Sequence, residues 1–179
     1  MKIVYPKEEV CMACRLCEVA CITEHSKSKD TLKAYKKENP APLSRTLVEE
    51  IFPGLSVSVM CRHCSDAPCI EACFTSAMHR LALSEVEGKP DGRVIVNEPK
   101  CVGCWMCIMA CPFGVIKRNQ YIGEGQGDNP LNPPLLRGKG KGQEIKVKLS
   151  SKCDLCPDRS IPACVEACPN KALVHEERN

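Results

Sequence analysis

The chain has 179 residues, a length that suits one compact domain or two small lobes. Only 4% of its residues are aromatic, whereas 16 are cysteines, which indicates a fold cross-linked by disulfides or metal rather than held by a large side-chain core. The formal charge of +3 does not indicate nucleic-acid binding, because thiolate-bound metal would make the sum more negative.

The first residues of the chain predict a reducing compartment, which favours metal ligation over disulfides. Residues 1–10 contain no apolar signal region, no twin arginine and no cleavage site, so we expect the protein in the reducing cytoplasm. The longest apolar run, residues 105–116, is well short of the roughly 20 residues that cross a bilayer. We therefore expect no direct membrane insertion, but peripheral contact through a partner remains compatible with the sequence.

Short alternating or β-branched runs predict strands before and after the cysteine-rich segments. In chain order they cover residues 2–5, 46–52, 55–59, 93–97, 115–117, 144–149 and 171–174. Residues 24–38 are polar and lysine-rich, with partial helical character, and form either a solvated face or a docking surface for an acidic partner. Residues 123–143 are rich in glycine and proline and predict a surface connector, since no helix-forming run follows them as in a phosphate-binding loop.

The sixteen cysteines form four quartets. They are Cys11, Cys14, Cys17 and Cys21; Cys61, Cys64, Cys69 and Cys73; Cys101, Cys104, Cys107 and Cys111; and Cys153, Cys156, Cys164 and Cys168. The first and third have the spacing C-x2-C-x2-C-x3-C, the bacterial ferredoxin pattern for a [4Fe-4S] cluster. Pro112 and Pro169 follow two of the quartets, whereas Ile22 follows the first, so the helix there should be less sharply limited.

This spacing favours iron–sulfur clusters over zinc. Structural zinc sites usually use two separated pairs of ligands, and none of these quartets divides in that way. Each quartet is complete, so we expect four [4Fe-4S] clusters and no [3Fe-4S] centre. Because such clusters replace a side-chain core, we also expect the iron-free protein to be largely unfolded.

In a two-cluster ferredoxin the fourth cysteine ligates the other cluster, so the quartets must pair. The gap between the second and third quartets, residues 74–100, is shorter than residues 22–60 or 112–152 at the outer joins. A nested arrangement is therefore predicted, although sequential pairing of the first with the second quartet stays possible. The nested ligand sets are Cys11, Cys14, Cys17 with Cys168; Cys153, Cys156, Cys164 with Cys21; Cys61, Cys64, Cys69 with Cys111; and Cys101, Cys104, Cys107 with Cys73.

The expected fold class is α+β, with two nested ferredoxin-like βαβ-type units, small sheets, short helices and long loops. Residues 1–60 and 118–179 would form an outer unit and residues 61–117 an inner unit. Gly103 would let the backbone approach a cluster closely. We expect Phe74, Phe113, Trp105 and Met106 to pack against the clusters. The four histidines, His25, His63, His79 and His175, are expected at the surface or beside a cluster, and not as ligands.

No nucleophile and base pair, dinucleotide motif or flavin motif stands out in the sequence. Four one-electron centres without a substrate site predict an electron carrier and not an enzyme. The rival hypothesis, a self-contained enzyme, would require a further cofactor. A zinc module is the third alternative.

The four-quartet plan resembles the electron-transfer subunits of dimethyl sulfoxide reductase, formate dehydrogenase and hydrogenase complexes, and in that family the pairing is nested. The segments at residues 14–19, 25–26, 33–36, 61–64, 101–105 and 152–156 look most like the ferredoxin subunit associated with nickel carbon monoxide dehydrogenase. The resemblance implies a catalytic partner, carbon monoxide dehydrogenase or a tungsten or molybdenum enzyme, and a downstream hydrogenase or flavin oxidoreductase.

Overall fold

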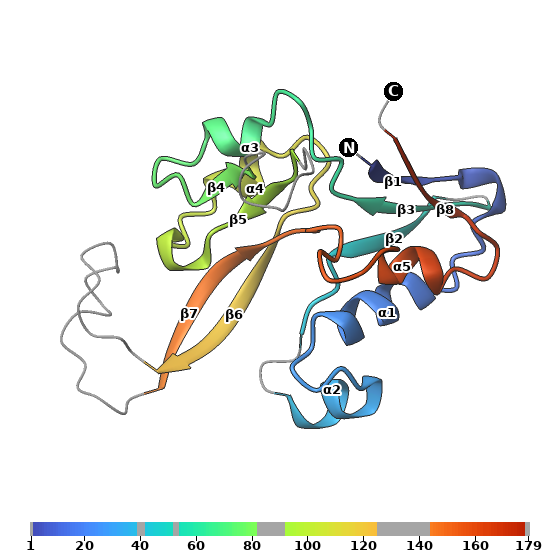
Figure 1. Ribbon diagram of the computed structural model, residues 1–179, viewed down its shortest axis with the longest axis horizontal. Coiled ribbons are helices and arrows are strands. Elements are labelled where there is room, and N and C mark those ends of the chain that lie inside the picture. Colours follow the sequence, from blue (N-terminus) through green and yellow to red (C-terminus); the bar gives the residue numbers. More distant parts are fainter. Residues whose placement is uncertain (1, 39–41, 52–53, 82–91, 125–143, 178–179) are drawn as a thin grey trace.

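The computed structural model describes residues 2–38, 42–51, 54–81, 92–124 and 144–177 (Figure 1). Its strands are β1 (Lys2–Pro6), β2 (Thr46–Ile51), β3 (Leu55–Met60), β4 (Met78–Arg80), β5 (Val94–Val96), β6 (Lys117–Glu124), β7 (Glu144–Ser151) and β8 (Leu173–Glu177). Its helices are α1 (Leu16–Glu24), α2 (Thr31–Lys37), α3 (Pro68–Glu71), α4 (Met106–Ala110) and α5 (Ala163–Glu166), with 3-10 turns η1 (Glu8–Val10) and η2 (Glu98–Lys100). The described strands pair as four two-stranded antiparallel sheets.

One lobe of the molecule is built from both ends of the chain. Strands β1 and β8 pair from Lys2 opposite Glu177 to Pro6 opposite Leu173, and helix α1 packs against α5. The β2–β3 hairpin lies beside this pair, and both termini lie at this lobe (Figure 1). We call it the outer lobe. Its core contains apolar side chains and cysteines together: Ile3, Val4, Cys17, Val48, Met60, Leu155, Cys164 and Leu173.

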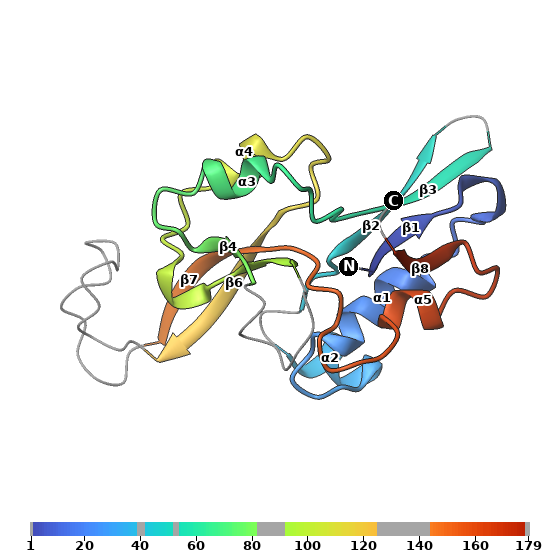
Figure 2. The same cartoon turned by 45° about the horizontal axis from the view of Figure 1, so that its top comes forward.

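The second lobe is smaller and comes from the middle of the chain. The short strands β4 and β5 pair antiparallel (Figure 1). Helix α3 packs against α4, and the two lie side by side in Figure 2. Its core consists of Ala67, Met78, Val94, Cys107 and Ile116. We call it the inner lobe. Because few large side chains are present in either core, the cysteines are part of the packing and not an addition to it.

The β6–β7 hairpin links the two lobes. Its register runs from Lys117 opposite Ser151 to Glu124 opposite Glu144, and the hairpin extends away from both lobes at its far end (Figure 1). At the near end, the Nζ of Lys117 donates to the Thr46 carbonyl at 3.2 Å. The chain leaves β7 and enters the fourth quartet directly, so this hairpin determines where Cys153 lies.

Six of the seven predicted strands agree with the structure apart from their limits, and one does not. Residues 115–117 were expected to form a return strand, but Val115 and Ile116 are buried in irregular backbone and β6 begins only at Lys117. That prediction was wrong because the apolar pair serves as inner-lobe core, and the strand that follows pairs with β7. Strand β4 has no counterpart among the predicted strands, and β8 begins two positions after the predicted start at residue 171.

Two less regular stretches were also predicted. Most of the glycine- and proline-rich connector, residues 125–143, lies outside the described residues, while Gly123 and Glu124 belong to β6. The lysine-rich segment contains helix α2, capped where the Asp30 side chain accepts from Lys33 N at 2.8 Å. Its exposed side chains, including Tyr35 at 81% and Leu32 at 69%, leave both the solvated-face and the docking interpretation open.

Candidate metal centres

Each cysteine loop contains two residues with left-handed backbone. They are Ala13 and Arg15, His63 and Ala67, Gly103 and Trp105, and Leu155 and Cys156. Non-glycine residues adopt positive φ at an energetic cost, so such a repeat marks a functional constraint. Left-handed residues next to right-handed ones turn successive N–H groups toward one side and form a concavity that binds anions, including iron–sulfur clusters. Gly103 at φ 69° therefore fits its predicted role, but Ala13 adopts φ 53° in the matching loop without glycine.

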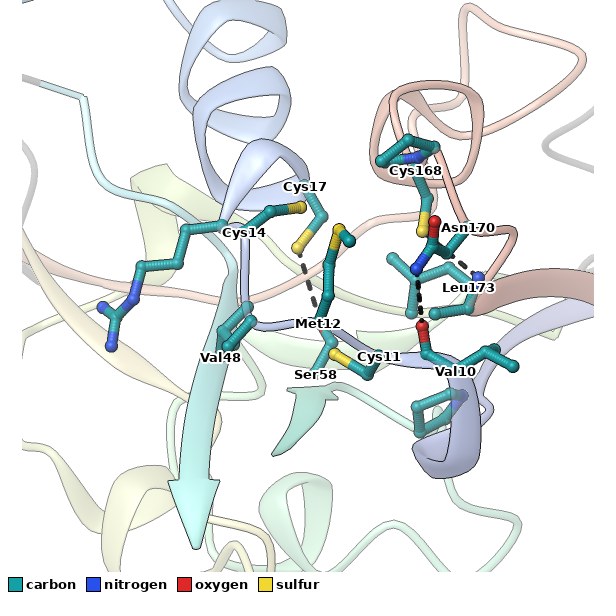
Figure 3. A pocket seen from close by; sticks show the side chains of 15 residues that line it. Val10, Cys11, Met12, Cys14, Cys17, Val48, Ser58, Cys168, Asn170 and Leu173 are labelled. Carbon is teal, nitrogen blue, oxygen red and sulfur yellow. Dashed lines mark hydrogen bonds between the residues drawn. The ribbon is translucent and has the colours of Figure 1, made fainter. Parts of the chain in front are cut away.

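The first cavity is lined by Cys11, Cys14 and Cys17 from the first quartet and by Cys168 from the fourth (Figure 3). The Ser58 hydroxyl lies 3.8 Å from the Cys17 sulfur, and Asn170 Nδ2 donates to the Val10 carbonyl at 3.2 Å, which ties the fourth quartet to the first loop. Burial raises the pKa of Cys17 although the hydroxyl opposes it.

The second cavity lies in the inner lobe. It is lined by Cys61, Cys64 and Cys69 from the second quartet and by Cys111 from the third. Burial, with the neighbouring thiolates of Cys61 and Cys111, raises the pKa of Cys69 to about 11, while the charge of Lys152 opposes this rise. Neighbouring thiolates repel one another, so each disfavours ionisation of the next. A bound metal cation would remove this repulsion, and it would hold all four cysteines as thiolates.

The remaining cysteines gather in the same crossed manner. The pKa of Cys107 is raised by burial and by Cys101, Cys73 and Cys104, so the fourth cysteine of the second quartet faces the third quartet. Burial, together with Cys21, Cys156 and Cys17, raises the pKa of Cys164 to about 12. Cys153 has a raised pKa for the same reason, with Cys164 and Cys21 as its thiol neighbours. Within the described residues, each quartet thus meets a cysteine from its partner quartet.

Backbone N–H groups donate to three of the fourth-position cysteines. Arg45 N lies 3.2 Å from Cys21 Sγ, Met78 N lies 3.3 Å from Cys73 Sγ and Ala172 N lies 3.2 Å from Cys168 Sγ. Burial raises the pKa of Cys21, but the hydrogen bond and charge of His25, and then the Arg45 N–H, outweigh it and lower the value. The pKa of Cys73 is likewise lowered despite burial, chiefly by the Met78 N–H, because donors favour the thiolate. No sequence pattern predicted these donors, since Arg45 and Ala172 lie in irregular backbone and Met78 begins β4, a strand that was not predicted.

A network of three charged side chains, His25, Arg45 and Asp154, lies between Cys21 and the start of the fourth quartet. Asp154 accepts from Arg45 Nη1, lies 3.1 Å from His25 Nε2 and accepts from Cys156 N at 3.1 Å. Burial disfavours the protonated form of His25, but the hydrogen bonds to Asp154 and Cys21 raise its pKa to about 9. Burial raises the pKa of Asp154, but His25 and Arg45 outweigh it, so the value is lowered. This network fixes the end of α1 against the loop that begins the fourth quartet.

The predictions for the other side chains were correct in part. His25 lies beside Cys21, and His63 is fully buried in the second cavity, where its Nδ1 accepts from Val94 N at 3.1 Å. The expected packing over the clusters was wrong for Phe74, which is 72% exposed, and for Met106, which is 51% exposed. Phe113 lines the second cavity, as expected, and also lies under the Arg62 guanidinium, while Trp105 lies under that of Arg118, both at 5.2 Å from ring centre to guanidinium carbon.

Groups of soft thiolates in concavities lined by N–H groups suit iron–sulfur clusters. A 4Fe-4S dicluster domain matches residues 54–126, and a second model of a 4Fe-4S dicluster domain matches residues 100–173. The class defined by fold and site is therefore a ferredoxin-like iron–sulfur protein with an α+β fold of small antiparallel sheets.

Relatives place the chain more closely. An iron–sulfur protein of Rhodospirillum rubrum is 34% identical, covering 96% of this chain and 80% of the relative. The electron transport protein HydN of Escherichia coli is 31% identical, covering 94% of this chain and 84% of HydN. Formate hydrogenlyase subunit 2 of Escherichia coli is 32% identical, covering 96% and 80%. The chain belongs to this family of 4Fe-4S electron-transport proteins.

Metal-binding cysteines and electron transport follow from this membership. In the part of the chain that the structure describes, every helix is too short or too polar to cross a membrane.

Proposed function

We propose that the chain is the electron-transfer subunit of an oxidoreductase complex and relays single electrons through four [4Fe-4S] clusters. A [4Fe-4S] cluster gains and loses one electron at a time, and its potential responds to charge, burial and hydrogen bonds to sulfur. The proposed ligand sets are Cys11, Cys14, Cys17 with Cys168; Cys153, Cys156, Cys164 with Cys21; Cys61, Cys64, Cys69 with Cys111; and Cys101, Cys104, Cys107 with Cys73. The observation that carries the proposal is the first cavity, where Cys168 joins three cysteines of the first quartet.

The ligand sets would divide between two units, an outer unit of residues 1–60 and 118–179 and an inner unit of residues 61–117. This division is supported by the pairing of β1 with β8, which closes the two chain ends on each other. It is also supported by the separate cores of the two lobes. Cys153 adjoins Lys152, which lines the second cavity, so the Cys153 and Cys61 sets would lie at the joint between the units.

The two other sets would then form the ends of the relay. Cys14 and Cys104 are exposed, unlike the other described cysteines, and each belongs to one of these end sets. Exposed apolar side chains lie in the same loops and helices, with Met12 at 59% and Met109 at 83%. An exposed ligand flanked by apolar surface suits close approach of a redox partner. We assign electron entry and exit to these two ends.

The proposed donor is carbon monoxide dehydrogenase, and the proposed acceptor is a hydrogenase or a flavin oxidoreductase. The donor assignment rests on the motif resemblance at residues 14–19 and 152–156. The equivalent subunit of a formate, tungsten or molybdenum oxidoreductase or of a hydrogenase is the alternative, and a relative named formate hydrogenlyase subunit 2 favours it. In either case the chain itself would carry no substrate site.

Anaerobic purification from native cells tests both levels of this proposal. We expect iron and acid-labile sulfide in the amounts of four cubanes per chain, and a catalytic subunit that copurifies. Reduction of the visible chromophore by carbon monoxide with that subunit supports the first donor, and reduction by formate or hydrogen supports the alternative. A chain that lacks sulfide, or that turns over a substrate by itself, contradicts the electron-transfer subunit.

A further inference from the structure

Lys152 is a buried cation between the two lobes. Its side chain is only 3% exposed, although lysine is among the residues that are rarely buried without a partner. It lies between the end of β7 and Cys153, and it lines the inner-lobe cavity together with Cys61, Cys64, Cys69 and Cys111. Its charge acts on the Cys69 thiol in that cavity.

The protein contacts of Lys152 do not neutralise this charge. Its ammonium donates to the Val94 carbonyl and, at 3.1 Å, to the Cys153 carbonyl. An ammonium has three N–H donors, so two are used by carbonyls of the inner and outer lobes. Among the described residues no carboxylate forms an ion pair with it. A buried charge is costly unless it meets an opposite charge. The thiolates of the cavity that Lys152 lines would supply this opposite charge.

We propose that Lys152 supplies the counter-charge for the cluster held by Cys61, Cys64, Cys69 and Cys111 and raises the reduction potential of that cluster. The inference rests on the ligand sets of the proposed function. A thiolate-bound cluster becomes more negative when it takes up an electron, and a cation at the cavity wall stabilises the added charge because screening by water is weak there. Through its charge, Lys152 thus sets the potential of the cluster at the joint between the lobes.

Reduction potentials of the holoprotein test this role. Lys152→Met removes the charge and keeps most of the length, while Lys152→Arg keeps the charge. Lys117→Met is the matched control, because Lys117 also links the lobes through a backbone carbonyl but is not among the residues that line the cysteine cavities described above. The readout is an anaerobic redox titration of each cluster by electron paramagnetic resonance, with iron and sulfide measured on every sample.

We expect Lys152→Met to lower the equilibrium constant for reduction of one cluster at least tenfold, which is about 59 mV for one electron. Lys152→Arg should restore most of this loss, and Lys117→Met should leave all potentials unchanged. If Lys152→Met binds less iron, Lys152→Gln provides the same test, since its amide still donates to a carbonyl without charge. Unchanged potentials in a variant with full iron content would overturn the proposal.

The affected cluster is identified with cysteine variants. Cys61→Ser and Cys111→Ser should alter the same spectral component, and this component should be the one that Lys152→Met shifts. A shift confined to the component altered by Cys156→Ser overturns the proposal, because the charge would then act on the outer lobe. If Cys61→Ser and Cys111→Ser alter different components, the proposed ligand sets fail, and a shift of the Cys61 component still supports the role of Lys152.

Discussion

Helices α1 and α4 carry the same cysteine spacing but end differently. Helix α4 stops at Ala110, and Cys111 has extended backbone, φ −77° and ψ 113°, because a proline disfavours helical conformation in the residue before it. Helix α1 continues past Cys21 to Glu24, where Ile22 supplies the N–H that Pro112 lacks. The residue after the fourth cysteine therefore decides whether that cysteine lies inside a helix or beyond it.

This difference changes how each lobe is held together. The extra turn of α1 brings His25 to Asp154, so the first and fourth quartets are joined by charged groups. In the inner lobe, Cys107 packs with Ala67 and Met78, so the second and third quartets are joined by apolar contact. One cysteine motif is thus supported by charged groups in the outer lobe and by apolar packing in the inner lobe.

Iron removal should have the largest effect, because cysteines belong to both cores. Chelation under anaerobic conditions should abolish the cooperative thermal transition and most secondary structure, since metal binding is coupled to folding. Circular dichroism before and after chelation measures this. A native-like cooperative melt of the iron-free chain would contradict it, and a melt of one lobe alone would show that the two types of support differ in strength.

Ile22→Pro should be the most damaging single substitution in the comparison. Proline inside α1 removes a helical hydrogen bond and clashes with the preceding turn, at a cost of about 3 kcal/mol. It should also displace His25 from Asp154. The free energy of unfolding of the holoprotein in denaturant provides the measurement. The matched variant Pro112→Ile should cost less than about 1 kcal/mol, because Cys111 already lies outside α4; equal losses would refute the comparison.

Asp154→Asn should lower the free energy of unfolding by about 1–3 kcal/mol, since it leaves Arg45 and His25 without their carboxylate. Loss of the visible chromophore with increasing denaturant reports the effect. The neighbouring Asp158 is exposed, so Asp158→Asn is the control and should stay close to the native value. If the two variants behave alike, the charged network does not stabilise the outer lobe.

Arg159→Ala should have the smallest effect. Arg159 joins the end of α1 to α5 through Glu24, at 2.9 Å, and through Glu166, but its side chain is 35% exposed. Exposed ion pairs contribute roughly 0–1 kcal/mol and weaken with salt. Denaturant titrations at low and high salt should show a loss below about 1 kcal/mol that shrinks as salt rises. A loss comparable with that of Asp154→Asn would mean that the surface pairs hold the helices together.

Sequence patterns predicted most of the secondary structure around the cysteines. The alternating run at residues 55–59 predicted a strand, and these residues form most of β3. The residues after the fourth cysteines, Ile22 and Pro112, correctly predicted the different ends of α1 and α4. The return strand at residues 115–117 failed because Val115 and Ile116 are apolar enough for a strand but fill the inner core instead. Local patterns cannot distinguish these two uses of an apolar pair.

The environment of the cysteines was less predictable than their spacing. The backbone donors to the fourth-position sulfurs are the N–H groups of Arg45, Met78 and Ala172 in the part of the chain that the structure describes, and any residue but proline could supply them. Asp154 and Lys152 are adjacent to Cys153 in the sequence, but their partners Arg45 and Val94 lie far away along the chain. Such contacts depend on tertiary packing, so the spacing of residues in the sequence does not predict them.

The crossed ligand sets are the central claim, and a crystal structure of the anaerobically purified holoprotein tests them most directly. Anomalous scattering at the iron edge locates each cubane and its sulfur ligands. We predict four cubanes, with Cys21 bound to the one that holds Cys153, Cys156 and Cys164. A cubane that binds both Cys21 and Cys61 would contradict the account.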